Sequence, residues 1–119
     1  MATYTKTTLS GSTDGKAILV AATATAGTLI HTGSTTTTTL HEMWIYAVNT
    51  SASDVKLTLE WGEATAPNGN IEYTVKAENG LYLIVPGLIL KGNATPLTVK
   101  AFAATTNVIA IHGYVNVIA

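Results

Sequence analysis

The chain of 119 residues contains no cysteine and no arginine. Without cysteine it can form neither a disulfide framework nor a thiolate nucleophile. Its six lysines are scattered and its net charge is −1, so it lacks the clustered cations and guanidinium groups with which proteins bind nucleic acid. We therefore expect no nucleic-acid partner.

Charge and long apolar runs are also scarce. Charged residues make up 11% of the chain, against about 25% in an ordinary soluble domain. The longest apolar run, residues 81–90, is interrupted by Pro86–Gly87 and is about half as long as a membrane-spanning helix. We expect no membrane partner and no secretion signal, because the N-terminal residues lack a basic stretch followed by an apolar one. Instead the chain has 22 threonines, many at strand positions expected to face outward, where threonine favours strands. Such weakly charged surfaces are often covered by another subunit, although Thr-rich exteriors also occur on monomers.

Apolar and polar residues alternate with a period of two, which places each set on one face of a β strand. The pattern is clearest in residues 54–61 and 71–78. The side chains expected to face the core are Leu57, Leu59, Trp61, Ile71, Tyr73, Val75, Val99 and Val108. Those expected to face solvent are Lys56, Glu60, Glu72, Lys76 and Lys100.

The pattern predicts one all-β domain. Residues 1–14, rich in Thr, Ser and Gly, are expected to form an extended arm or an edge strand, and residues 15–119 a single β-sandwich domain. Residues 16–23 are apolar on both faces, so we expect that strand to be central or sandwiched between two layers. The remaining strands are expected at 27–32, 38–49, 54–62, 71–78, 81–85, 97–103 and 108–118. About eight or nine short strands without helical periodicity indicate an antiparallel, jelly-roll-like β-sandwich.

Three pairs of consecutive strands are predicted to form hairpins. Asn79–Gly80 is the strongest signal, because both residues tolerate the positive φ angles of a type I′ turn. Residues 97–103 are expected to pair with 108–118, and residues 40–48 with 55–61. In the last pair, Trp44 and Trp61 are expected to pack in the core.

The titratable residues show no catalytic or metal-binding spacing. The histidines, which we expect to be structural or at the surface, are His31, His41 and His112. Three carboxylates flank one turn, namely Glu60, Glu63 and Glu72. They resemble the carboxylate pair of a glycosidase only in lying close together in the sequence. Because these carboxylates alternate with core residues, we expect them to be solvated. We predict no enzymatic activity, no metal and no cofactor.

Aromatic residues leave one binding function open. Trp44, Tyr46, Trp61, Tyr73 and Tyr82 would suit a carbohydrate-binding sheet face. Both tryptophans share a face with aliphatic residues, so core packing is favoured over sugar binding. A carbohydrate-binding module for host attachment remains an alternative.

Three segments carry a family resemblance over residues 38–119. They are LHEMWIYAVNTSASDVKLTLEWG, IEYTVKAENGLYLIVPGLIL and VKAFAATTNVIAIHGYVNVIA. Together they resemble small virion proteins of tailed bacteriophages, of the capsid decoration (cement) type. The resemblance implies a β-sandwich without enzymatic activity that is assembled in the host cytoplasm and present in many copies on the capsid surface.

The resemblance also implies partners. They are the major capsid protein and further copies of the chain, most simply in a homotrimer. The N-terminal arm is expected to dock, so that deleting residues 1–12 weakens attachment and leaves the sandwich folded. The residues suggested for the interface are Tyr4, Lys6, Leu9, Thr36 and Thr38. A tail, neck or fibre-associated structural protein is the alternative within the same particle.

Overall fold

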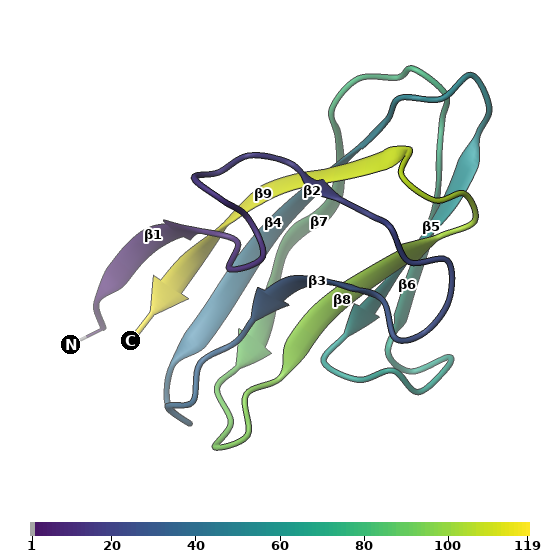
Figure 1. Ribbon diagram of the computed structural model, residues 1–119. Helices are drawn as coiled ribbons and strands as arrows, with labels where there is room; N and C mark the ends of the chain where they lie inside the picture. The colour runs from purple at the N-terminus through teal and green to yellow at the C-terminus, as the bar shows by residue number, and fades with distance from the viewer. Residues whose placement is uncertain (1) are drawn as a thin grey trace.

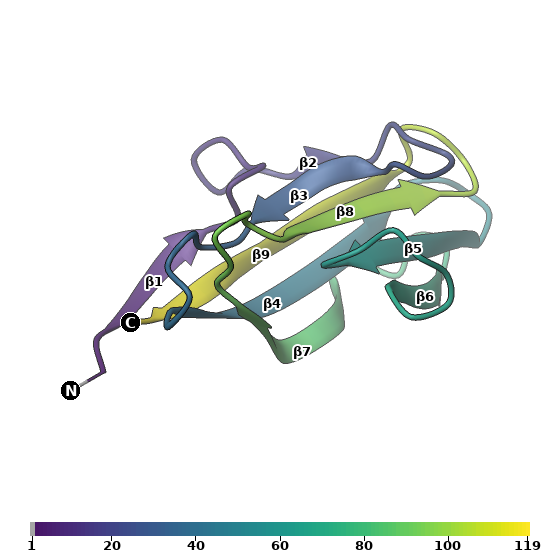
Figure 2. The ribbon, with the colours of Figure 1, turned by 90° about the horizontal axis from the view of Figure 1, so that it is seen from below.

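The computed structural model describes residues 2–119, and Met1 lies outside the described residues. Residues 2–119 form nine β strands and no helix, in two layers that pack face to face (Figures 1 and 2). The strands are β1 (Tyr4–Thr8), β2 (Ile18–Leu19), β3 (Thr28–Thr32), β4 (Leu40–Asn49), β5 (Val55–Trp61), β6 (Asn70–Val75), β7 (Tyr82–Lys91), β8 (Thr98–Ala103) and β9 (Ile109–Ile118). The prediction of an all-β sandwich is confirmed.

The strand order is that of a jelly roll. One sheet has the order β1-β9-β4-β7, with β2 also paired to β9, and the other has the order β3-β8-β5-β6. Every pairing is antiparallel. Strand β1 pairs with residues 114–118 of β9 and β2 with residues 110–111, so these two strands together form one edge of the five-stranded sheet.

The three predicted hairpins are wrong. The strands that they would join, β4 and β5, β6 and β7, and β8 and β9, lie in different sheets. At the turn after β6, the residues with positive φ are Glu78 and Gly80, so the type I′ pattern at Asn79–Gly80 is absent. A turn signal predicts that the chain reverses, but the burial of both apolar sheet faces decides which sheet receives the next strand. Strands β5 and β6 do form a hairpin.

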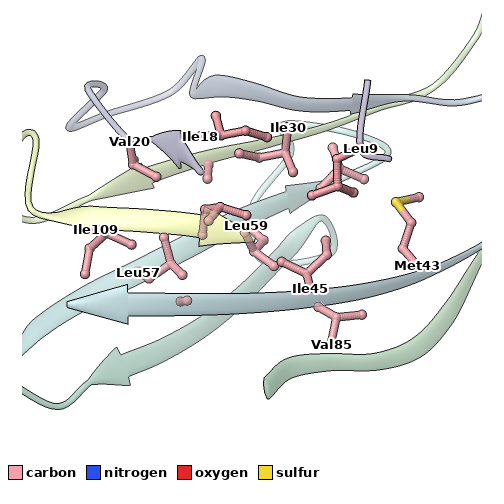
Figure 3. Packing of buried hydrophobic residues seen from close by; sticks show 14 of the residues in the cluster. Leu9, Ile18, Val20, Ile30, Met43, Ile45, Leu57, Leu59, Val85 and Ile109 are labelled. Atoms are coloured by element: carbon pink, nitrogen blue, oxygen red, sulfur yellow. The ribbon is translucent and has the colours of Figure 1, made fainter. Parts of the chain in front are cut away.

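The core lies between the sheets and is built from alternate residues of the strands (Figure 3). Of the predicted inward set, Leu57, Leu59, Val75 and Val99 are buried. The other members are partly buried and pack against this core, namely Trp61, Ile71, Tyr73 and Val108. Of the predicted outward set, Lys56, Glu72 and Lys76 are exposed and Lys100 is half-buried.

Glu60 is the exception, because only 3% of it is exposed. It lies on the outer face of β5, as alternation predicts, but the loop between β2 and β3 covers that face. Its carboxylate accepts hydrogen bonds from the Gly27 N–H, at 2.7 Å, and from the Thr25 hydroxyl. Gly27 crosses β8 so closely that a Cβ there would lie 2.5 Å from the Ala101 carbonyl oxygen. The expectation of a solvated Glu60 is therefore wrong.

Residues 2–20 are part of the sandwich. Leu9 is 1% exposed and belongs to the core (Figure 3), so it is not available as an exposed docking anchor. The neighbouring Gly11 N–H donates to the Ile30 carbonyl at 2.9 Å. The strand predicted at 16–23 is only β2, and it lies at an edge rather than at the centre. There Ile18 is buried and Leu19 is 51% exposed.

Candidate functional site

The outer face of the five-stranded sheet carries aromatic side chains. On β4, Met43, Ile45 and Ala47 are buried in the core, whereas Trp44 and Tyr46 face outward and are half-buried. The expectation that Trp44 packs in the core is therefore wrong. Both faces of β4 are apolar enough to be buried, so alternation alone does not identify the inner one.

Trp44 is part of a row that crosses the whole sheet. Its ring stacks beside that of Tyr114 on β9, with ring centroids 6.2 Å apart and planes at 11°. On the other side the indole lies over Gly87 of β7, where a Cβ would come within 3.0 Å of it. At the β1 edge, the Lys6 ammonium is 4.7 Å from the Tyr114 ring centroid, a cation–π contact.

Glu42 is fixed by the groups around it. One carboxylate oxygen, Oε1, accepts a hydrogen bond from the Asn116 amide at 2.8 Å and another from the Trp44 indole N–H at 3.0 Å. The bond from Asn116, and to a smaller extent that from Trp44, lowers the pKa of Glu42 from its ordinary value. Glu42 is therefore ionised at neutral pH. Its second oxygen, Oε2, receives no hydrogen bond from residues 2–119.

A hollow of about 400 Å³ opens beside this carboxylate. Its lining residues are Tyr4, Thr5, Lys6, Glu42, Asn116 and Ile118. Tyr4 is 73% exposed, so its ring forms an open wall of the hollow. Of the five residues suggested for an interface, Tyr4 and Lys6 come together here. Glu42 and Asn116 were missed, although alternation on β4 does place Glu42 on the same face as Trp44.

The other two exposed interface residues lie elsewhere. Thr36 and Thr38 are exposed in the loop between β3 and β4. This loop is at the same end of the sandwich as both chain termini (Figures 1 and 2). The five suggested residues therefore divide among the core, the hollow and this loop.

The opposite edge of the five-stranded sheet is apolar. The exposed side chains of what we name the β7 strip are Leu81, Tyr82, Leu88 and Ile89, each between 39% and 59% exposed. A second hollow of about 280 Å³ adjoins it, lined by Ile71, Ile84, Val85, Pro86, Gly87 and Leu88. The rings of Tyr82 and Tyr73 stack at 4.9 Å and 13°, which joins the β7 strip to strand β6 of the other sheet.

Two of the histidines form a buried pair inside the sandwich. His31 Nε2 and His41 Nδ1 are 2.8 Å apart, and the Ser10 N–H donates to His31 Nδ1 at 2.9 Å. Burial, reinforced by the positive charge that His41 can carry, lowers the pKa of His31 to about 4. His112 instead lies on the outer face, opposite Tyr46. Residues 2–119 hold no group of three or more His, Asp or Glu residues that could bind a metal ion.

The three carboxylates near the β5–β6 turn have different surroundings. Glu60 is held by the β2–β3 loop, whereas exposed Glu72 forms an ion pair with Lys56 at 3.0 Å. Glu63 is exposed in the turn itself. The first two carboxylates are thus engaged by different partners.

Comparisons with known proteins find no matching family model, curated protein or solved structure. Within the described chain, no helix is long and apolar enough to cross a membrane.

Proposed function

We propose that this chain is a bacteriophage capsid decoration (cement) protein, which associates with itself and with the major capsid protein on the virion surface. The resemblance over residues 38–119 suggests the role. The jelly roll is compatible with it, since viral capsid domains use this fold, although one fold serves many functions. The observation that carries the proposal is the β7 strip.

The β7 strip has the character of a protein–protein contact. Its four large side chains have no charge, and an apolar hollow adjoins them. Exposed apolar side chains beside such a hollow are typical of interaction sites. Pro86 lacks an N–H, and the pairing of β7 with β4 is irregular between Met43 and Trp44 and again between Ile45 and Tyr46. Such a strand is a poor template for open-ended strand addition. Side-chain packing in a closed cyclic oligomer suits it better, and the trimer matches the three-fold positions of a capsid lattice.

The contact with the major capsid protein is assigned to the end of the sandwich that carries Thr36 and Thr38. Their hydroxyls are small and uncharged, so covering them costs little desolvation free energy in comparison with burying charges. The lattice then repeats the same weak contact many times, which raises the overall affinity.

Self-association is tested by light scattering of the purified chain after size-exclusion chromatography. We expect a trimer, and we expect Leu88→Lys to dissociate it while the monomer stays folded. Leu19→Lys is the matched control, because Leu19 has a similar exposure on the opposite edge of the same sheet. A monomeric wild-type chain, or equal effects of both substitutions, would contradict this part of the proposal.

Capsid attachment is tested by co-sedimentation with preformed expanded capsids. We expect the wild-type chain to sediment with them, and Thr36→Glu or Thr38→Glu to weaken this binding. Thr105→Glu, in the exposed loop between β8 and β9 at the other end of the sandwich, should bind as wild type. If the chain sedimented with isolated tails and not with heads, the tail, neck or fibre alternative would replace the proposal.

A further inference from the structure

Three polar side chains on the outer face of the five-stranded sheet form one row. Lys6 on β1 is the register partner of Asn116 on β9, which is in turn the partner of Glu42 on β4. On one side of this row lies the row of Tyr4, Ile118 and Leu40, and on the other lies the row of Thr8, Tyr114 and Trp44. The hollow thus has a polar floor bordered by apolar and aromatic side chains.

The polar row retains hydrogen-bonding capacity of both kinds. Both hydrogen bonds that residues 2–119 donate to the Glu42 carboxylate end on Oε1. Its other oxygen, Oε2, can therefore accept a hydrogen bond from a ligand. Asn116 uses one amide N–H and retains its carbonyl oxygen and the other N–H. The Lys6 ammonium forms no ion pair with residues 2–119 and contacts only the Tyr114 face among the groups described. A ligand here meets donors and acceptors side by side, which suits hydroxyl groups, because each can donate and accept.

The charges of the row disfavour a ligand that carries charge of one sign only. A phosphate or carboxylate placed beside Lys6 would also face the ionised Glu42, and a cation placed beside Glu42 would face Lys6. The volume of about 400 Å³ falls in the range of about 300–1,000 Å³ that is usual for small-molecule sites. The exposed Tyr4 ring supplies an apolar surface against which the C–H groups of a sugar ring can pack.

We propose that this hollow binds a neutral saccharide, with Glu42, Asn116 and Lys6 hydrogen-bonding to its hydroxyls and Tyr4 packing against its ring. Trp44 and Tyr114 are positioning residues. The Trp44 N–H fixes the Glu42 carboxylate, and the Tyr114 ring holds the Lys6 ammonium by a cation–π contact. The site is on the opposite edge of the sheet from the β7 strip, so the proposed self-association leaves it open, and binding is tested on the isolated chain.

The test follows amide chemical shifts by NMR while intact protein is titrated with neutral disaccharides, namely cellobiose, lactose, maltose and N,N′-diacetylchitobiose. Glucose 6-phosphate and sialyllactose serve as charged comparators. We expect at least one neutral disaccharide to shift the amides of Thr5, Lys6, Glu42 and Asn116, with a Kd on the order of 1 mM. The charged comparators should bind more weakly than the best neutral sugar.

Variants locate the site. Tyr4→Ala and Asn116→Ala should each weaken binding roughly tenfold, which corresponds to about 1.4 kcal/mol. Tyr82→Ala and Glu72→Gln are matched controls on other surfaces and should bind as wild type, and the melting temperature of each variant shows whether it remains folded. The proposal is overturned if no neutral disaccharide shifts the named amides, if a charged comparator binds more tightly, or if folded Tyr4→Ala and Asn116→Ala bind as wild type.

Discussion

The hydrogen bonds of His31 and His41 determine where their protons lie. Because the Ser10 N–H donates to His31 Nδ1, that nitrogen carries no proton. In a neutral ring His31 Nε2 is then protonated and donates to His41 Nδ1 across 2.8 Å. Protonation of His31 would place a proton on Nδ1, which could then no longer accept the hydrogen bond from the Ser10 N–H. The histidine pair and the segment beside Leu9 are therefore stable only while the imidazoles are neutral.

This network predicts a loss of stability in acid. The pKa of His31 falls from an ordinary value of 6.5 to about 4 in the folded chain, so between these pH values the unfolded chain binds more protons. The contribution of His31 is therefore complete above about pH 6.5, declines as the pH falls towards 4, and changes little below that. Melting temperatures measured from pH 7 to pH 4 should fall steeply for the wild type and less for His31→Gln.

His112→Gln is the control for this measurement. His112 lies on the outer face of the sheet, away from the buried pair, so this variant should keep the steep wild-type decline. A decline for His31→Gln as steep as that of the wild type would show that other groups cause the acid sensitivity.

Leu59 tests the assignment of the inner face. It is fully buried, and Leu59→Ala should lower the free energy of unfolding by about 2–5 kcal/mol, because a cavity remains in the core. Leu81→Ala, at a position that is 59% exposed, should change it by about 0.5 kcal/mol or less in the monomer. Urea unfolding measures both. Similar losses for the two variants would mean that the inner face is misassigned.

At the scale of elements, the β2–β3 loop explains why the alternation of β5 predicted a solvated Glu60, although this residue is buried. Alternation placed Glu60 on the outer face correctly, and nothing in a strand pattern reveals that a loop from elsewhere covers that face. Gly27 is the residue whose lack of a side chain makes this close crossing possible. Its position in an irregular Thr- and Ala-rich segment does not reveal the crossing.

Removing the Glu60 carboxylate should therefore loosen the loop. Glu60→Ala should cost about 1.5–3 kcal/mol, since it leaves the Gly27 N–H without its charged acceptor. Hydrogen exchange of the amides in residues 23–27 should become faster. Glu72→Ala is the matched control, because exposed ion pairs contribute about 0–1 kcal/mol. Unchanged exchange in the loop would mean that Glu60 does not hold it.

Two N-terminal truncations distinguish the contribution of edge strand β1 to stability from that of the core residue Leu9. Deleting residues 1–8 removes an exposed edge strand, whereas deleting residues 1–12 also removes buried Leu9 and the Ser10 bond to His31. We expect the second truncation to have a far lower melting temperature, because emptying a core leucine site alone costs about 2–5 kcal/mol. Equal melting temperatures would show that Leu9 contributes nothing, as the sequence-based expectation for the 1–12 deletion implies.

At the scale of the whole molecule, jelly-roll winding limits what the sequence can predict. Local alternation predicted most strands, the class of fold and much of the core, because those features depend on near neighbours. The pairings depend on which strands bury each other's faces, so all three predicted hairpins were wrong. Because the pairings could not be predicted, the row of Lys6, Asn116 and Glu42 could not be predicted either. Its members come from the two ends and the middle of the chain. Only Tyr4 and Lys6 of this site were suggested from sequence.

The central claim is the capsid location, and cryo-electron microscopy of the assembled phage particle tests it most directly. The account predicts nine-stranded sandwiches on the outer capsid surface at three-fold or quasi-three-fold positions, with the β7 strip between copies and the Thr36–Thr38 loop towards the major capsid protein. A reconstruction that places the chain only in the tail, or that leaves the capsid surface bare, would contradict it.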